Sequence, residues 1–412
     1  MAGKASGMTL PGGSSKTIHL PEGFSFSAVA AGLKASRGLD LALVEAVPGT
    51  NAAALFTTNR VVAAPIPVGR AHLATTRGRV RALIVNSGNA NCATGKAGLR
   101  ACTRICHQTA RLLQVGDNEV FPSSTGIIGV PMPVGKILEK LPELIAAREA
   151  TEQGIHQFAR AIMTTDTRPK LASARFLSGN SEVRLLGIAK GSGMIHPQLA
   201  TMLVYLFTDM AAGTADLKRL LHQTCDQTFN CISVDGDTST NDTVFLLASG
   251  RSGVRLRDPS VRKKFENALL EVCQSLAEQI ICDGEGVQHV IQLFVEQAKS
   301  REEALQIARA VAHSLLVKTA WAGADPNWGR ILAAVGRCGL PIEPKRIDIL
   351  IGNQLVCRRG VANPFDETNA HQALSQPRCD IRIRLQRGRR SAAFLTTDLT
   401  AEYVRINADY ST

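Results

Sequence analysis

The segment from Lys190 to Asp209 has the residue types and the spacing of a self-cleavage site that would release a nucleophile. A Gly-rich stretch, KGSGMIHPQL, precedes Ala200 and Thr201, and a strongly apolar run follows them. If the chain breaks between Ala200 and Thr201, Thr201 becomes the first residue of a new chain. An N-terminal Thr carries a hydroxyl nucleophile together with its own α-amine base, whose ordinary pKa is about 8. The same hydroxyl could make the break by attacking the Ala200 carbonyl, in an N→O acyl shift followed by ester hydrolysis.

The same pattern is also typical of a strand that begins after a Gly/Pro loop, and residue types alone favour this plainer interpretation. His196, five residues before Thr201, invites comparison with a Ser/His base. Because an N-terminal amine would already act as the base, we interpret His196 as a loop residue that positions the scissile bond.

Other motif matches fail on spacing. Residues 88–96 imitate a phosphate-binding loop, but six residues separate the two glycines where four are needed. Residues 235–246 imitate a calcium loop, but Thr240 stands where Gly is required and Leu246 where Glu is required. Neither HExxH nor GxSxG occurs, which excludes zincins and the usual α/β-hydrolases.

The ten cysteines favour buried, reduced thiols over a disulfide framework or a zinc cage, because no CxxC occurs and the spacings are irregular. Cys102, Cys106 and His107 fall one turn apart on an expected helix, but further ligands with suitable spacing are missing. We therefore expect no metal site.

The elements that must position these residues follow a mixed α/β pattern. Apolar runs broken by Gly, Pro and Asn predict strands, and apolar residues at helical spacing predict helices. Ser300 and Glu303 form a capping box that opens one helix. No period of 20–50 residues repeats, so the sequence predicts mostly antiparallel sheets with helices layered on them. Strands are expected at 25–32, 39–46, 53–59, 64–70, 81–88, 173–179, 183–191, 201–209, 243–250, 290–297, 346–352, 379–388 and 391–399, and helices at 98–114, 134–150, 152–163, 215–228, 259–281 and from 300 onward.

Length and composition are those of a globular protein with two or three domains, or with one large domain. The chain has 412 residues, of which 45% are apolar and 20% charged. No apolar stretch approaches the roughly 18 residues that span a bilayer, and the first residues lack the apolar core of a secretory signal. We expect a soluble, cytoplasmic protein.

The net charge of +12 is unevenly placed, with 22 Lys and Arg against 11 Asp and Glu in residues 1–200. A basic half can indicate nucleic-acid binding. The basic residues are scattered singly, however, and aromatic residues are only 4%. We favour a positive potential that attracts small acidic metabolites.

Eight segments in a fixed order give the chain its resemblance to a known family. It resembles the ornithine acetyltransferase family, the glutamate N-acetyltransferases of arginine biosynthesis, whose precursors cut themselves before a Thr. One departure is HPQLATM, where the family commonly has Asn-Met before Ala-Thr. The matching segments are NSGNANCATG (86–95), SSTGIIG (123–129), MTTDT (163–167), KGSGMIHPQLATML (190–203), SVDGDTSTNDT (233–243), CDGEG (282–286), GADPNWGRI (323–331) and NADYST (407–412).

The resemblance implies catalytic roles for three positions. Thr201 would be the nucleophile that becomes acetylated. Thr125 and Gly126 would form the oxyanion hole, where each hydrogen-bond donor stabilises the transition state by about 3–4 kcal/mol. Without the resemblance, residues 123–129 would be interpreted as an ordinary Ser/Thr-Gly loop.

The resemblance also implies substrate-binding roles. Lys190 would bind an amino-acid carboxylate, although residue type alone suggests a solvated loop lysine. Thr164 would contact substrate, with Thr165 as the alternative if the register is off by one. Glu285 would pair with an ammonium group of the substrate. Thr201, Asn407 and Thr412 complete this set, and the last two imply that the C-terminal tail folds back over the site.

Trp321 and Trp328 are interpreted as core or site-wall residues. The segment SVDGDTSTNDT has no sharper assignment than shaping the pocket.

The implied fold is a layered α/β structure similar to the N-terminal-nucleophile hydrolases: two sheets between helices, plus a smaller C-terminal α/β lobe. The precursor would cut itself into residues 1–200 and 201–412, which stay associated in an α2β2 assembly. The implied reaction is ping-pong, moving the acetyl group of N2-acetylornithine through Thr201 to glutamate. No metal or organic cofactor is implied, and the use of acetyl-CoA as a co-substrate stays open.

Two other functions remain as alternatives. A self-cleaving amidohydrolase or aminopeptidase of related fold would pass the acyl group to water instead of glutamate. A basic, non-catalytic binding protein would bind polyanions with a strong dependence on salt.

Overall fold

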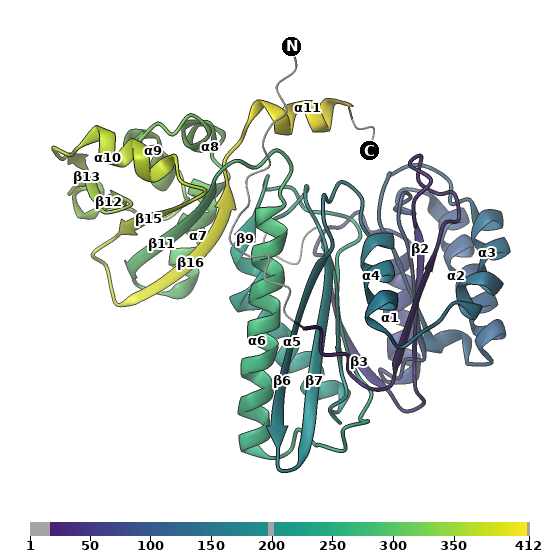
Figure 1. Ribbon diagram of the computed structural model, residues 1–412. Helices are drawn as coiled ribbons and strands as arrows, with labels where there is room; N and C mark the ends of the chain where they lie inside the picture. Colours follow the sequence, from purple (N-terminus) through teal and green to yellow (C-terminus); the bar gives the residue numbers. More distant parts are fainter. Residues whose placement is uncertain (1–16, 197–201, 410–412) are drawn as a thin grey trace. The chain divides into compact units, whose positions relative to one another are not determined.

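The computed structural model describes residues 17–196 and 202–409 (Figure 1). Their described parts form two compact units. The sandwich unit comprises residues 17–230 and 237–280, with the gap at 197–201. The C-terminal unit comprises residues 231–236 and 281–409.

The sandwich unit is built from two sheets packed face to face. Their inner faces share one core, in which Phe26 of one sheet packs edge-on against Phe207 of the other with ring centroids 5.2 Å apart. The four-stranded sheet has the order β1-β2-β4-β5 and the five-stranded sheet the order β3-β10-β8-β7-β6. The strands are β1 (Phe24–Val29), β2 (Leu41–Ala46), β3 (Asn51–Phe56), β4 (Ala82–Asn86), β5 (Val120–Ser124), β6 (Lys170–Ser178), β7 (Ser181–Lys190), β8 (Leu203–Thr208) and β10 (Thr243–Ala248).

Helices cover the outer face of each sheet. The helices α2 (Gly95–Leu113) and α3 (Val134–Ala146) pack on the four-stranded sheet through a second core. The helices α5 (Thr214–Gln227) and α6 (Pro259–Cys282) pack on the five-stranded sheet. At Gly187 of β7 an added Cβ would lie 2.7 Å from side chains of α6, so glycine permits this close approach. The predicted arrangement of two sheets between helices is therefore confirmed.

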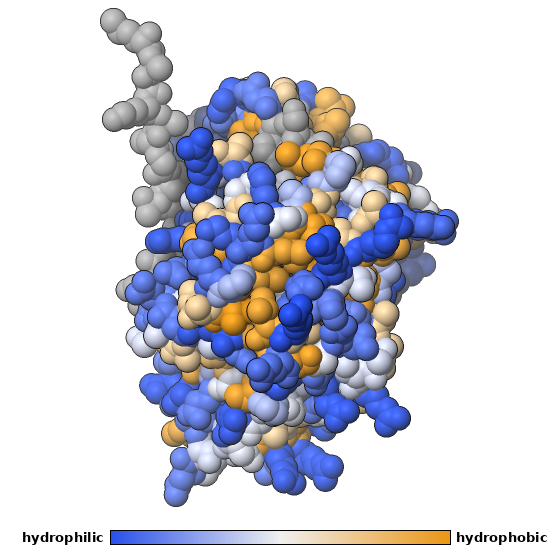
Figure 2. Space-filling model, turned by 90° about the vertical axis from the view of Figure 1, so that its right-hand side faces the viewer, coloured by the Kyte–Doolittle hydropathy of each residue, from blue (hydrophilic) through white to orange (hydrophobic). Residues whose placement is uncertain are grey.

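The helix α4 (Glu152–Ala161) ends close to the candidate site. It contributes Ile155 and Phe158 to the core between the sheets. Thr151 caps its start, where the side chain accepts a hydrogen bond from the Gly154 N–H at 3.1 Å. Figure 2 shows the molecule from the side on which α2 and α3 lie, where hydrophilic side chains surround an apolar area.

The expected strand at 64–70 is wrong, because these residues begin the helix α1 (Pro65–Thr76). The alternation of Pro with Ile and Val imitates a strand. Proline nevertheless fits the first turn of a helix, where backbone N–H groups have no intrahelical partner and φ is already helical. Gly69 then lets α1 approach β5, since an added Cβ would lie 2.8 Å from the ring of Phe121.

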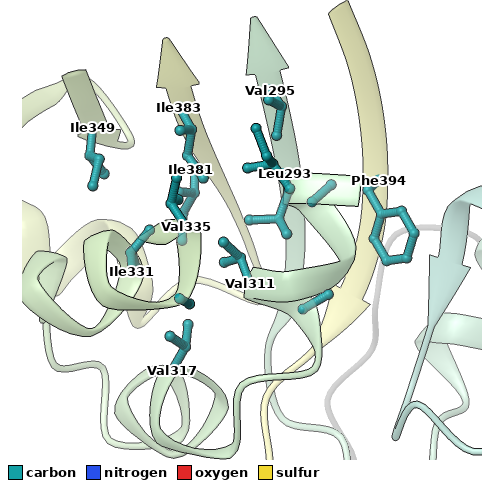
Figure 3. Packing of buried hydrophobic residues seen from close by; sticks show 14 of the residues in the cluster. Leu293, Val295, Val311, Val317, Ile331, Val335, Ile349, Ile381, Ile383 and Phe394 are labelled. Atoms are coloured by element: carbon teal, nitrogen blue, oxygen red, sulfur yellow. The ribbon is translucent and has the colours of Figure 1, made fainter. Parts of the chain in front are cut away.

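The C-terminal unit is a seven-stranded sheet covered by helices, with the strand order β14-β13-β12-β15-β11-β16-β9. Its core joins α7 and α9 to β11 and β15 (Figure 3). Trp321 is buried in this core and Trp328 packs against it, so the core interpretation of both residues is confirmed. The elements are β9 (Ile232–Ser233), β11 (Val290–Ala298), α7 (Arg301–Ala312), α8 (Leu315–Ala322), α9 (Trp328–Gly336), β12 (Asp348–Ile351), β13 (Gln354–Arg358), β14 (Val361–Ala362), α10 (Glu367–Leu374), β15 (Arg378–Arg384), β16 (Arg390–Thr397) and α11 (Ala401–Asp409).

All ten cysteines are free thiols, and all but Cys282 are buried. A hydrogen bond with Cys102, together with burial, raises the pKa of the Cys106 thiol well above its usual value. His107, in contrast, is exposed and bonds through Nδ1 to Asp117 Oδ2 at 2.8 Å. In the described residues, no helix has both the length and the apolar character needed to cross a membrane.

Candidate active site

Three of the predicted site residues meet in the sandwich unit around the ammonium group of Lys190. Lys190 is the last residue of β7 and is buried, with 4% of its surface exposed. Its Nζ donates a hydrogen bond to Thr164 Oγ1 at 2.7 Å and to Thr125 Oγ1 at 3.4 Å. Thr164, and not its neighbour Thr165, makes this contact. Three segments far apart in the sequence thus supply one polar cluster.

The turn after β5 carries Thr125 and Gly126, the predicted oxyanion hole. Gly126 has φ +131°, and an added Cβ would lie 2.3 Å from the carbonyl carbon of Gly88. Only glycine fits at this position. Within the described residues the Gly126 N–H donates no hydrogen bond, whereas the Thr125 N–H donates to Asn86 O at 3.0 Å. The turn therefore offers the Thr125 hydroxyl and the Gly126 N–H as donors.

Buried amide side chains hold this turn in place. Asn86 Oδ1 accepts a hydrogen bond from Ser124 Oγ at 2.6 Å. Asn241 donates from Nδ2 to Ser124 O at 2.8 Å and to Ala90 O at 2.7 Å. Asn241 belongs to the segment SVDGDTSTNDT, so this part of the segment supports the oxyanion turn. No local sequence pattern indicates either asparagine, because their partners are backbone carbonyls or side chains of other segments.

Asp166 is a further residue of the site that the sequence did not predict. Its side chain is fully buried, and Oδ1 accepts hydrogen bonds from Lys170 Nζ at 2.6 Å and from the Gly191 N–H at 2.7 Å. Oδ2 accepts from the Thr164 N–H at 3.0 Å and lies 3.9 Å from Lys190 Nζ. Burial raises the pKa of the Asp166 carboxyl, but the ammonium groups of Lys170 and Lys190 outweigh it and hold the pKa well below its usual range.

Lys34 adds a further positive charge near the cluster. Its Nζ donates to the carbonyls of Leu39 at 2.9 Å and Ala161 at 3.2 Å. Burial and, to a smaller extent, the charge of Lys190 together lower the pKa of Lys34 to about 8, against the opposing effects of Asp40 and Asp166. The lysines at 34, 170 and 190 outnumber the aspartates at 40 and 166 by one. Such an excess suits a bound carboxylate.

The predicted cleavage site, Ala200 and Thr201, lies outside the described residues, as does Thr412. The described chain resumes at Met202, which is buried and whose carbonyl accepts a hydrogen bond from the Thr243 N–H at 3.2 Å. The next residue, Leu203, pairs with Lys190 in the antiparallel register of β7 and β8. The residue after Thr201 in the sequence is therefore fixed at the same sheet end as Lys190.

The C-terminal unit brings together two more predicted residues. Asn407 of α11 donates from Nδ2 to Glu285 Oε2 at 2.8 Å. At Gly286, which has φ +67°, an added Cβ would lie 2.4 Å from the Tyr403 N atom. Tyr403 in turn donates from its hydroxyl to Asp235 Oδ2 at 3.2 Å. The C-terminal helix α11 therefore packs directly on the CDGEG loop.

The layered sheets define the class of this protein, an α/β sandwich, and the buried Lys–Thr–Asp cluster is its candidate active site. A family model described as the ArgJ family matches residues 25–412. The arginine biosynthesis bifunctional protein ArgJ of Methylococcus capsulatus is 43% identical over 394 residues, which is 95% of each chain. The protein of the same name from Dehalococcoides mccartyi is 41% identical over 417 residues, covering 99% of this chain and 100% of the relative. This chain therefore belongs to the ArgJ family and is an enzyme of arginine biosynthesis.

The chain is also similar to a solved structure, that of the arginine biosynthesis bifunctional protein argJ from Bacillus halodurans. The identity is 38% and the TM-score 0.48, and the match covers 50% of this chain and 98% of the solved one.

Proposed function

We propose that this enzyme moves the acetyl group from N2-acetylornithine to glutamate through Thr201, which yields ornithine and N-acetylglutamate. The observation that carries this proposal is the contact of Lys190 with Thr164 and Thr125 in a chain of the ArgJ family. The same cluster supplies a cation for a substrate carboxylate and hydroxyl groups for a polarised carbonyl.

The chemistry divides one difficult acyl transfer into two easier ones. The Thr201 hydroxyl attacks the acetyl carbonyl of N2-acetylornithine, and the α-amine of Thr201 takes the hydroxyl proton. The resulting oxyanion accepts hydrogen bonds from the Thr125 hydroxyl and the Gly126 N–H. The C–N bond then breaks, the ornithine amine leaves with the proton, and the acetyl group stays on Thr201 as an ester.

The second half reverses these steps with another amine. The amine of glutamate attacks the ester carbonyl, and the Thr201 oxygen leaves and regains a proton. Lys190 holds the α-carboxylate of each substrate in turn. Glu285, Asn407 and Thr412 keep the substrate-binding roles that the family resemblance implies, and the Glu285 carboxylate suits an ammonium.

We further propose that residues 1–200 and 201–412 stay together after cleavage and assemble as α2β2. Ten free cysteines, nearly all buried, support a reducing compartment such as the cytoplasm. The reaction needs no metal or organic cofactor. The relatives are named bifunctional, which supports a second reaction. We propose that in this reaction acetyl-CoA donates the acetyl group to glutamate.

One experiment tests the transfer. Purified enzyme is incubated with N2-acetylornithine in the presence and absence of glutamate, and ornithine is measured together with N-acetylglutamate. We expect ornithine to accumulate with glutamate, in equal amount to N-acetylglutamate, and to stop after one turnover without it. Ornithine formed equally fast without glutamate would show the hydrolase alternative. The variant Thr201→Ala should stay a single full-length chain on a denaturing gel and make neither product.

A further inference from the structure

The carboxylate of Asp166 joins three segments that lead into the candidate site. It accepts hydrogen bonds from the backbone N–H of Thr164, in the loop after α4, and from the backbone N–H of Gly191, after β7. It also accepts a hydrogen bond from Nζ of Lys170, the first residue of β6. A buried carboxylate is retained in a fold only when such partners offset its desolvation.

We infer that Asp166 is a positioning residue. It fixes the position of the Lys190 ammonium group and the direction in which the chain leaves β7 toward the cleavage bond. The first part of this inference rests on the proposed function. The second part concerns self-cleavage and needs no substrate.

The positioning of Lys190 follows from how two lysines share one carboxylate. Lys170 makes the short ion pair at 2.6 Å, whereas Lys190 Nζ stays 3.9 Å from the other oxygen. Lys190 therefore directs its short hydrogen bond to Thr164 Oγ1. Asp166 also accepts a hydrogen bond from the Thr164 N–H. It therefore positions Thr164, whose hydroxyl accepts the short hydrogen bond, as well as Lys190, which donates it. The Lys190 ammonium is attracted without being drawn into a close pair, and it can approach a substrate carboxylate.

The positioning of the cleavage segment follows from the bond to Gly191. Gly191 is the first residue after β7, and the segment that it begins ends at Ala200. The bond from the Gly191 N–H to Asp166 Oδ1, at 2.7 Å, fixes the direction in which the chain leaves the sheet. Self-cleavage requires a hydroxyl and a carbonyl of this chain in near-attack geometry, which an unfixed segment would reach rarely.

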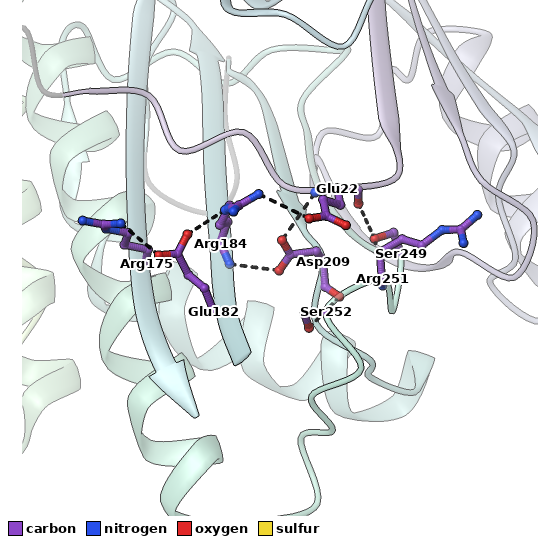
Figure 4. A network of polar contacts seen from close by, with 8 residues as sticks. All are labelled: Glu22, Arg175, Glu182, Arg184, Asp209, Ser249, Arg251 and Ser252. Carbon is purple, nitrogen blue, oxygen red and sulfur yellow. Dashed lines mark hydrogen bonds and ion pairs between the residues drawn. The ribbon is translucent and has the colours of Figure 1, made fainter. Parts of the chain in front are cut away.

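Asp209 offers a matched control, because it lies at the end of the paired strands β7 and β8 that is opposite to Lys190. It is buried, follows β8, and accepts the backbone N–H groups of Arg184 at 2.9 Å and Glu22 at 3.3 Å (Figure 4). Near that end Thr208 pairs with Leu185, whereas Lys190 pairs with Leu203 at the other. The variant Asp209→Asn therefore removes a buried, backbone-bound carboxylate without touching the candidate site.

The test compares three variants, D166N, K170M and D209N, for cleavage rate on denaturing gels and for KM and kcat of the cleaved enzyme. In D166N an amide replaces a carboxylate that accepts hydrogen bonds from two backbone N–H groups and Lys170, and that attracts Lys190 from 3.9 Å. We expect cleavage to slow about tenfold or more and KM for N2-acetylornithine to rise about tenfold or more, with a smaller change in kcat. In K170M, Asp166 still accepts the Gly191 N–H but draws Lys190 into a close pair. Cleavage should then stay near the wild-type rate while KM rises.

D209N should stay within about twofold of the wild type in both measurements. The inference is overturned if D166N matches D209N in cleavage and KM, or if K170M leaves KM unchanged. Unfolding temperatures are measured for both variants. The inference is also overturned if D166N and D209N show equal falls in unfolding temperature together with equal losses of activity, because a general loss of stability would then explain both. A wild-type enzyme that cleaves itself but transfers no acetyl group would instead overturn the proposed function, and the cleavage rates would still test the second part of the inference.

Discussion

Lys190 carries the proposed recognition of the substrate carboxylate. It is buried at the end of β7, beside two threonine hydroxyls and within 3.9 Å of Asp166. A buried ammonium makes stronger contacts with a carboxylate than a solvated one, because less water competes. The substitution Lys190→Met keeps the length of the side chain and removes the charge. KM for both substrates should rise about tenfold to a hundredfold, the effect of one hydrogen bond to a charged group.

Steady-state kinetics on the cleaved variant check this prediction. Lys140→Met is the control, because the Lys140 side chain is partly exposed and, within the described residues, forms its ion pair with Glu143 across one helical turn. Equal KM values for the wild type and Lys190→Met would remove Lys190 from substrate binding.

Gly126 tests the oxyanion turn. An alanine there would place its Cβ 2.3 Å from the Gly88 carbonyl carbon, so the turn must shift. Since the proposed donor is the Gly126 N–H itself, we expect kcat/KM to fall about a hundredfold or more. Gly129 is a matched control in the same loop: it also has positive φ, +83°, but an added Cβ there meets nothing within 4 Å. Gly129→Ala should cost about 1 kcal/mol of stability and keep its activity, and an equal loss in both variants would refute the assignment.

At the residue scale, the sequence predicted Lys190, Thr164, Thr125 and Gly126 only through family resemblance, and the structure brings these four together. It could not predict Asp166. An Asp in a polar loop is ordinarily exposed, and its burial here arises only when β6 and the end of β7 close around it. Its one visible signal is Lys170, four residues later in the sequence.

The five-stranded sheet has a consequence for the cleaved enzyme. In the order β3-β10-β8-β7-β6, the strands β8 and β10 come after the predicted break but lie between β3 and β7, which come before it. The register pairs Leu185–Lys190 with Leu203–Thr208, and Asn51–Phe56 with Thr243–Ala248. Separating the two products would break both ladders and expose the core between the sheets.

We therefore predict that residues 1–200 and 201–412 co-elute on gel filtration in native buffer, at the volume of uncleaved Thr201→Ala. They should separate only in denaturant. Two native peaks, each with one fragment, would contradict this sheet order or the position of the break.

At the element scale, hydrophobic spacing predicted most helices and strands of the sandwich correctly. It failed for α1, because prolines in a first helical turn imitate the alternation of a strand. The pairing of β3 with β10 lies nearly two hundred residues apart in the sequence, and no local pattern indicates it.

The whole molecule has two units, and the C-terminal unit buries a lysine of its own. Lys318 Nζ donates to Thr397 O and lies 3.3 Å from Thr397 Oγ1, at the end of β16. Burial lowers the pKa of Lys318 to about 8, although the charges of Asp398 and Asp235 oppose the shift. Between pH about 8 and 10.5 the unfolded chain therefore binds more protons at this residue than the folded one, and folding stability rises with pH.

The variant Lys318→Met should lack this rise. The difference in unfolding temperature between the wild type and the variant should shift in favour of the wild type from about pH 7.5 to about pH 10. Because the cysteines and tyrosines are common to both proteins, their titration cancels in the difference. If the difference in unfolding temperature stayed constant or fell as the pH rises, it would contradict the lowered pKa of Lys318.

At the scale of the molecule, the sequence predicted a sandwich and a C-terminal lobe through the family resemblance. It did not predict that residues 231–236 belong to the C-terminal unit, where β9 pairs with β16. A two-residue strand paired about 160 residues away has no signal in local sequence.

The central claim is that Thr201, freed at a new chain start, carries the acetyl group between substrates. Mass spectrometry of the enzyme incubated with N2-acetylornithine alone tests this most directly. We predict a fragment that begins at Thr201 and has gained the mass of one acetyl group, located on that threonine and lost when glutamate is added. An active enzyme that remains one intact chain, or an acetyl group trapped on another residue, would contradict the account.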